Sequence, residues 1–167
     1  MIRSLNILHY SLYLIEKKLH SLFNKINPAL LLFKILSVKK RMKNKEGIEN
    51  PTEWYDDFWT DKKNGFSLWF IGGWLIGIIS LIFIGLGITI TKILFPEIVL
   101  SKYFFISSGI ISYLICYFSV FKNDQYLKYF KEFENWNTNE KRIKTLTSIA
   151  FILSVIVLFF SSLIYFN

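Results

Sequence analysis

The stretch FSLWFIGGWLIGIISLIFIGLGITIT, residues 66–91, decides the fold of this chain. Its 26 residues include no Asp, Glu, Lys or Arg. At a rise of about 1.5 Å per residue, a helix of this length covers about 39 Å, more than the roughly 30 Å hydrocarbon core of a bilayer. The stretch therefore predicts a transmembrane helix, which we place at residues 67–92.

Two further uncharged segments follow, 19 residues at 103–121 and 23 residues at 145–167. Each is long enough to cross a bilayer as a helix. The alternative, three buried helices of a soluble protein, would leave almost no polar chain to cover them. We therefore expect an all-α integral membrane protein with three transmembrane helices, at 67–92, 102–121 and 145–166, together with amphipathic helices at the cytoplasmic interface.

The composition agrees with this fold class. The 167 residues are 53% hydrophobic and 19% charged, with a formal charge of +8, whereas a soluble domain is about 45–50% apolar and about 25% charged. This balance disfavours a soluble globular enzyme and a disordered chain. Cys116 is the only cysteine, so a secreted scaffold held by intrachain disulfides is disfavoured as well.

The basic residues predict the orientation in the membrane. Twelve Lys and Arg precede the first span, six lie in the loop 122–144, and two lie between spans one and two. Because cytoplasmic flanks retain positive charge, we expect the N-terminus and this loop in the cytoplasm and the C-terminus outside. The abundance of Ile, Lys, Asn, Phe and Tyr fits an AT-rich coding sequence, which would explain part of the positive charge. The membrane that we expect is a bacterial inner membrane.

Residues 1–45 form the first predicted region, an amphipathic helix followed by a basic cluster. The apolar residues that recur at helical spacing are Leu5, Leu8, Leu12, Ile15, Leu19, Leu22 and Ile26. Asn6, His9 and Glu16 fall on the other side, and Lys39, Lys40 and Arg41 follow. Such a helix can lie in the membrane interface, pack on the spans of its own chain or bind a partner, and we favour the interface beside anionic headgroups. If translation starts at Met42, this helix has no role.

Residues 46–65 predict a short connecting helix that begins at Pro51, is capped by Asn50 and ends before Asn64. Aromatic residues occupy one face of it, which suits a headgroup boundary. Nearby carboxylates lack a His or Cys neighbour, so we expect no metal site. The region 66–167 is then the three-span membrane domain.

The loop 122–144 predicts another helix, with aromatic residues at helical spacing among lysines. Aromatic and basic residues together also occur in nucleic-acid platforms, but the helical period and the adjacent spans disfavour that class of partner. The residues expected to contact the membrane surface are Lys39, Lys40, Arg41, Trp54, Trp59, Tyr126, Phe130, Phe133 and Trp136.

Small residues form a stripe on each span. The candidate helix-packing or oligomer-interface residues are Gly73, Gly77, Ser80, Ser108, Ser112 and Ser154. Small residues allow helix backbones to approach closely in lipid. The stripes can face one another in one bundle, Gly73 and Gly77 can pair with another copy or another membrane protein, or the hydroxyls can line an oligomeric pore.

Residues that carry chemistry are scarce. No Asp, Glu, Lys, Arg or His lies within a predicted span, which disfavours an ion-coupled transporter. His9 and His20 are too far apart along their helix to form an adjacent-turn ligand pair, and we expect both at a surface or interface. We find no phosphate loop and no nucleophile elbow. We therefore expect no catalytic residue, no cofactor and no metal.

Two functions are compatible with this pattern. The first is a non-enzymatic membrane protein that acts through protein or membrane-surface contacts, as an accessory subunit, an immunity factor or an anchor does. Its partners would be the bilayer and a membrane protein or a second copy, and not nucleic acid. The alternative is a small oligomeric protein that permeabilises membranes, as holins and related effectors do.

Overall fold

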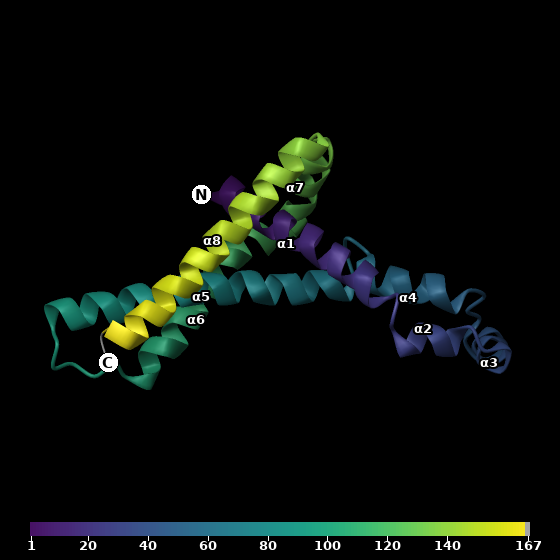
Figure 1. Cartoon of the computed structure of the whole chain (residues 1–167), viewed down its shortest axis with the longest axis horizontal. Coiled ribbons are helices and arrows are strands. Elements are labelled where there is room, and N and C mark those ends of the chain that lie inside the picture. Colours follow the sequence, from purple (N-terminus) through teal and green to yellow (C-terminus); the bar gives the residue numbers. More distant parts are fainter. Residues whose placement is uncertain (166–167) are drawn as a thin grey trace. The chain divides into compact units, whose positions relative to one another are not determined.

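The computed structural model describes residues 1–165, which form helices joined by short turns (Figure 1). The helices are α1 (Ile2–Phe23), α2 (Pro28–Phe33), α3 (Leu36–Glu46), α4 (Pro51–Thr60), α5 (Phe66–Leu94), α6 (Lys102–Cys116), α7 (Gln125–Glu134) and α8 (Thr138–Tyr165). A π-helical turn, η1 (Tyr117–Phe121), and a 3-10 turn, η2 (Lys122–Asp124), connect α6 to α7. Residues 1–165 contain no strand, so the predicted all-α fold is confirmed.

Three of these segments are long and apolar enough to cross a membrane, as predicted: α5, α6 continued by η1, and α8. The first two match the predicted spans within a few residues. The third helix begins earlier, at Thr138, because the Asn137 carboxamide oxygen accepts a hydrogen bond from the Glu140 amide at 2.7 Å and caps the helix there. Residue 166 of the predicted third span lies outside the described residues.

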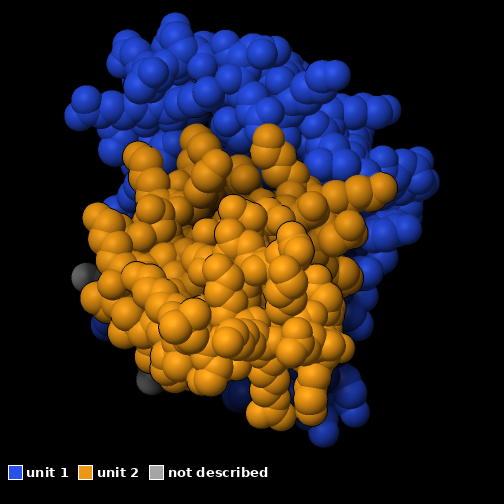
Figure 2. All heavy atoms as spheres, turned by 90° about the vertical axis from the view of Figure 1, so that its right-hand side faces the viewer, with its two compact units in different colours: residues 1–12, 72–167 blue, residues 13–71 orange. Residues whose placement is uncertain are grey.

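The chain divides into two compact units, coloured separately in Figure 2. Unit 1 contains residues 1–12 and 72–167, and unit 2 contains residues 13–71. Unit 1 therefore holds the first half of α1 together with most of the membrane helices. Unit 2 holds the second half of α1, the helices α2 to α4 and the first turns of α5.

In unit 1, the chain reverses between α6 and α7 at Asn123 and Asp124, whose φ angles are 56° and 51°. Asn and Asp are the residues, besides Gly, that occur most readily in this left-handed region. The reversal brings α7 against the first half of α1. The guanidinium of Arg3 lies 2.7 Å from the carboxylate of Glu132, and the Asn6 amide donates to the carbonyl of Ser119 at 3.0 Å.

The buried side of α1 differs in part from the predicted one, since Leu8 of the apolar stripe is buried as expected. Asn6 and His9, expected on the polar side, are 0% and 1% exposed, whereas Leu19 and Leu22 of the apolar stripe are 48% and 58% exposed. Asn6 and His9 are buried because the Asn6 amide donates to a carbonyl of η1 and the His9 ring packs on an aromatic ring of α7. Local periodicity therefore identified the helix but not the side of it that the fold covers.

In unit 2, helix boundaries follow local chemistry. The helix α3 ends at Gly47, whose φ of 69° is left-handed and whose amide donates to the Lys43 carbonyl. The helix α4 begins at Pro51, as predicted, but the Asn50 side chain makes no capping hydrogen bond. After α4, the Asp61 carboxylate accepts hydrogen bonds from the amides of Lys63 and Asn64 at 2.7 and 2.6 Å. These bonds lower the pKa of Asp61.

Gly65 completes this turn, and replacing it with alanine should destabilise unit 2. An added Cβ would collide with the backbone carbonyl of Asp61 and lie 2.9 Å from that of Trp59. Because neither contact is with a flexible side chain, we expect G65A to lower the free energy of unfolding by about 1–3 kcal/mol. Denaturant titration in detergent micelles measures this. Gly109→Ala is the matched control, since nothing lies within 4 Å of its added Cβ; an equal loss in G109A would contradict the prediction.

Candidate functional site

The first candidate site is a face of α5 that the chain itself leaves open. Gly73 and Gly77 are exposed, and a Cβ added at either position would meet no atom within 4 Å. They lie one helical turn apart, so both point to the same side of the helix. We call the surface at Gly73 and Gly77 the open glycine face.

Two other glycines of α5 behave differently. A Cβ added at Gly85 would lie 3.4 Å from the Cα of Phe159 in α8, and one added at Gly87 would collide with the ring of Phe104 in α6. These two glycines therefore serve packing among the membrane helices of unit 1. The open glycine face serves no such contact.

The serine stripes do not converge on the open glycine face. Ser80 is half-buried, Ser108 and Ser112 are buried, and Ser154 is exposed. The Ser108 hydroxyl donates to the Phe104 carbonyl at 2.8 Å and the Ser112 hydroxyl to the Ser108 carbonyl at 2.7 Å. Ser154 likewise donates to a carbonyl of its own helix. On α8, the small side chains that are buried are instead Ser148 and Ser162.

The second candidate site comprises the aromatic residues of α7, which were expected at the membrane surface. Tyr126, Phe130 and Phe133 are 7%, 1% and 0% exposed, so these rings are not available to a bilayer. The Phe130 ring centroid lies 5.0 Å from that of Tyr10 and 5.2 Å from that of His9. They form an aromatic core with residues 6–10 of α1, at separations typical of attractive ring pairs.

His9 lies at the centre of this aromatic core. Its ring makes edge contacts with Phe121 and Tyr126 at 5.8 and 5.6 Å. Neither ring nitrogen has a hydrogen-bond partner among residues 1–165. Burial lowers the pKa of His9 to about 4, so the ring is neutral at pH 7. The burial of His9 was not predicted, because a histidine on the polar side of an amphipathic helix is expected to be exposed to solvent.

The remaining aromatic residues of the predicted surface set are only partly covered. Trp136 is half-buried, with its ring stacked 4.2 Å from that of Phe133. Trp54 is 45% exposed. Trp59 is half-buried and stacks on Phe66 with ring centroids 4.8 Å apart. Trp54 is thus the most accessible of these rings for contact with headgroups.

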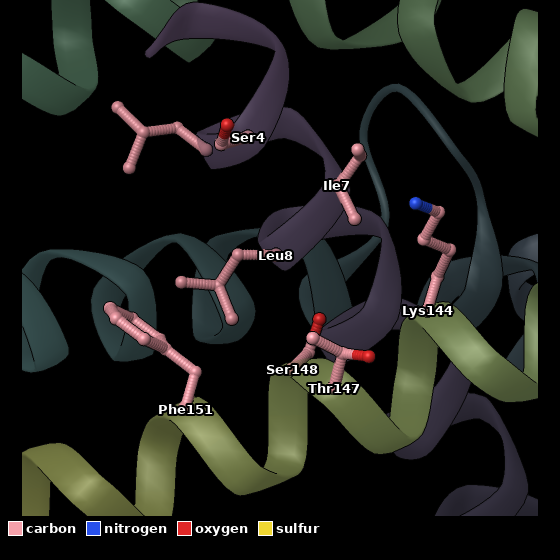
Figure 3. A pocket seen from close by; sticks show the side chains of 8 residues that line it. Ser4, Ile7, Leu8, Lys144, Thr147, Ser148 and Phe151 are labelled. Carbon is pink, nitrogen blue, oxygen red and sulfur yellow. The ribbon is translucent and has the colours of Figure 1, made fainter.

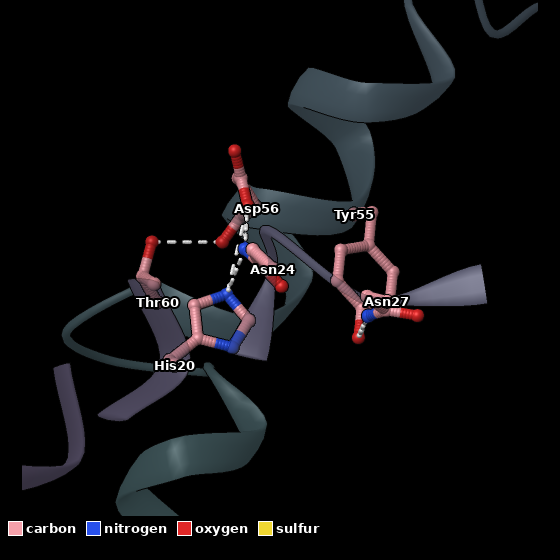
Figure 4. A network of polar contacts seen from close by, with 6 residues as sticks. All are labelled: His20, Asn24, Asn27, Tyr55, Asp56 and Thr60. Atoms are coloured by element: carbon pink, nitrogen blue, oxygen red, sulfur yellow. Dashed lines mark hydrogen bonds and ion pairs between the residues drawn. The ribbon is translucent and has the colours of Figure 1, made fainter. Parts of the chain in front are cut away.

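In unit 2, a polar network joins the end of α1 to α4 (Figure 4). The Asn24 amide donates to the Asp56 carboxylate at 3.0 Å and lies 2.9 Å from Nε2 of His20. Burial lowers the pKa of His20, although Asp56, at 3.5 Å, acts in the opposite direction. A neutral Nε2 can accept the Asn24 amide proton, so this contact needs no charge on His20. The Oδ1 atom of Asn24 is buried without a hydrogen-bond partner among the described residues.

The basic cluster at Lys39, Lys40 and Arg41 lies on α3, where all three side chains are exposed. No residue of α3 is buried. The cluster can therefore approach an anionic surface without any rearrangement of side chains inside unit 2.

Reactive side chains do not gather into a centre. Within residues 1–165, no group of three or more His, Cys, Asp or Glu is placed to hold a metal ion. Cys116 is buried in α6. The candidate sites of the described chain are therefore exposed surfaces and packing contacts. Comparison with protein-family models, with curated proteins and with solved structures finds no match to this chain.

Proposed function

We propose that this chain is a non-enzymatic, multi-pass membrane protein that acts by binding a partner transmembrane helix along the open glycine face of α5. The partner is another membrane protein or a second copy of the chain. The basic cluster and the exposed aromatic residue Trp54 attach unit 2 to the membrane surface. This places the protein among accessory subunits, immunity factors and anchors.

The glycines of α5 differ in whether another helix lies over them, and this difference supports the proposal. Gly85 and Gly87 have neighbours from α8 and α6, whereas no described residue lies within 4 Å of a Cβ added at Gly73 or Gly77. In lipid, close backbone approach at two small residues spaced four apart is a common basis of helix association. An open pair of this kind within an apolar helix fits a contact with a helix from outside the chain.

The proposed orientation places the N-terminus and α7 in the cytoplasm. The contacts of Arg3 with Glu132 and of Asn6 with Ser119 require residues 1–12 and α7 to lie on the same side of the bilayer. Two membrane crossings between them, by α5 and by α6 with η1, meet this requirement. The excess of Lys and Arg on these segments supports the cytoplasmic side.

Site-specific photocrosslinking in cells tests the proposal. A photoreactive side chain at Leu81, one turn beyond Gly77, should yield a discrete crosslinked product. Replacing Gly77 with leucine should reduce that product at least fivefold, because the larger side chain keeps a partner helix at a distance. Since nothing lies within 4 Å of a Cβ at Gly77, this variant should fold. Gly109→Leu on α6, where the space is equally open, should leave the product unchanged.

The outcome also separates the two candidate functions. A product that survives G77L, or that G109L removes equally, would argue against the open glycine face. If induced expression collapses the membrane potential reported by a voltage-sensitive dye, the permeabilising function replaces the proposed one. We expect the potential to stay unchanged, because the buried hydroxyls of Ser108 and Ser112 already donate to carbonyls of their own helix.

A further inference from the structure

A cavity of about 310 Å³ lies in unit 1 between the first turns of α1 and the beginning of α8 (Figure 3). Its lining consists of Ser4, Leu5, Ile7 and Leu8 from α1 and of Lys144, Thr147, Ser148 and Phe151 from α8. None of these residues belongs to the open glycine face or to the aromatic rings of α7.

One end of the cavity offers hydrogen-bond donors that have no acceptor within the described chain. Lys144 is half-buried as a residue and is in none of the ion pairs of residues 1–165. Ser148 is only 5% exposed, yet its hydroxyl makes no hydrogen bond to another described residue and points into the cavity (Figure 3). Ser4 adds a second hydroxyl to the lining, on the side of the cavity away from Lys144 (Figure 3). Because Ser148 lines the cavity, its hydroxyl can donate a hydrogen bond to a ligand or a water held there.

The other end of the cavity is apolar. Phe151 follows Lys144 by seven residues, about 10 Å along the helix axis. Leu5 and Leu8 complete this end. Lys144 is also the last charged residue before the uncharged segment 145–167. The cavity therefore runs from the level of the headgroups toward the hydrocarbon core.

We propose that this cavity binds one anionic phospholipid. Its phosphodiester accepts hydrogen bonds from Lys144 and Ser148, and the first part of an acyl chain lies against Phe151, Leu5 and Leu8. The volume is at the lower end of the range for small-molecule sites, about 300–1,000 Å³, which suits a headgroup and the upper part of one chain. Basic pockets beside transmembrane helices on the cytoplasmic side are known places for such headgroups.

Lipid titration of the full chain in a non-ionic detergent tests this site. Native mass spectrometry should show one retained phosphatidylglycerol on the parent protein and much less phosphatidylcholine. Lys144→Gln should weaken phosphatidylglycerol binding about fivefold, the effect of one basic contact with an anionic lipid. Arg142→Gln is the matched control: it removes one charge from an exposed position on α8 that does not line the cavity, and it should bind as the parent does.

A second variant probes the cavity without changing charge. Ser148→Leu fills the space beside Lys144 and should displace the lipid, while the thermal midpoint without lipid shows whether the protein folds. Equal weakening by R142Q and K144Q would mean nonspecific surface charge and would overturn the proposal. If inorganic phosphate raised the thermal midpoint as much as phosphatidylglycerol does, the acyl chains would add nothing to binding. The site would then bind a free anion instead of a phospholipid. These outcomes do not depend on the open glycine face, which the variants leave intact.

Discussion

Replacing Phe130 with alanine should lower the free energy of unfolding by about 3–5 kcal/mol, the range observed for aromatic residues removed from a packed core. Phe130 is 1% exposed and lies between the rings of Tyr10, His9 and Tyr126. Its removal leaves a cavity where α7 meets the first half of α1. The packing between these two helices depends on this ring more than on the exposed ion pair of Arg3 with Glu132.

Denaturant titration in detergent micelles gives the stability change of F130A, and hydrogen exchange at residues 2–12 reports whether α1 leaves α7. The matched control is Phe95→Ala, which removes the same side chain at a position that is 56% exposed. We expect F95A to change stability by less than about 0.5 kcal/mol. Similar losses in both variants, with unchanged exchange at residues 2–12, would show that the aromatic core is not a structural contact.

The second large effect is a loss of stability on acidification, caused by His9. Its pKa is about 4 in the folded protein and about 6.5 in an unfolded chain. Between these values the unfolded state binds a proton that the folded state does not, so stability is complete above pH 6.5 and falls as the pH approaches 4. A shift of this size corresponds to about 3 kcal/mol at the acidic end.

Thermal unfolding of the parent and of His9→Leu, followed from pH 7.5 to pH 4 in detergent, isolates this contribution. The difference between the two proteins should change by about 3 kcal/mol across that interval. His20 and the carboxylates are present in both proteins, so their titration cancels in the difference. The rings of Phe121, Tyr126 and Phe130 pack around the His9 ring, and burial is the cause of its lowered pKa. A difference that is constant with pH would mean that His9 is accessible to protons in the folded state.

The membrane helices could be predicted from sequence because their signal is local. A run of uncharged apolar residues long enough to span a bilayer has few other stable placements. The boundary at Thr138 was missed because it depends on a single cap by Asn137 rather than on hydropathy. The helix α4 was predicted from its proline, although its expected asparagine cap forms no side-chain bond.

The contacts between helices could not be predicted in the same way. Asn6 and His9 carry polar atoms and are nevertheless buried, because the Ser119 carbonyl and the α7 rings lie against them in the folded chain. Gly73, Gly77, Gly85 and Gly87, four of the five glycines of α5, look alike in the sequence. Which of them pack within the chain depends on where Phe104 and Phe159 lie, information that exists only in three dimensions.

Labelling of single cysteines tests whether three helices cross the bilayer. In a Cys116→Ser background, an impermeant maleimide should modify Glu97→Cys only in right-side-out vesicles, and Glu46→Cys and Glu140→Cys only in inside-out vesicles. This pattern places the connection between α5 and α6 opposite both α3 and the start of α8. Labelling of Glu97→Cys and Glu140→Cys from the same side would contradict a membrane crossing by α6 and η1, and with it the placement of the open glycine face and the Lys144 cavity.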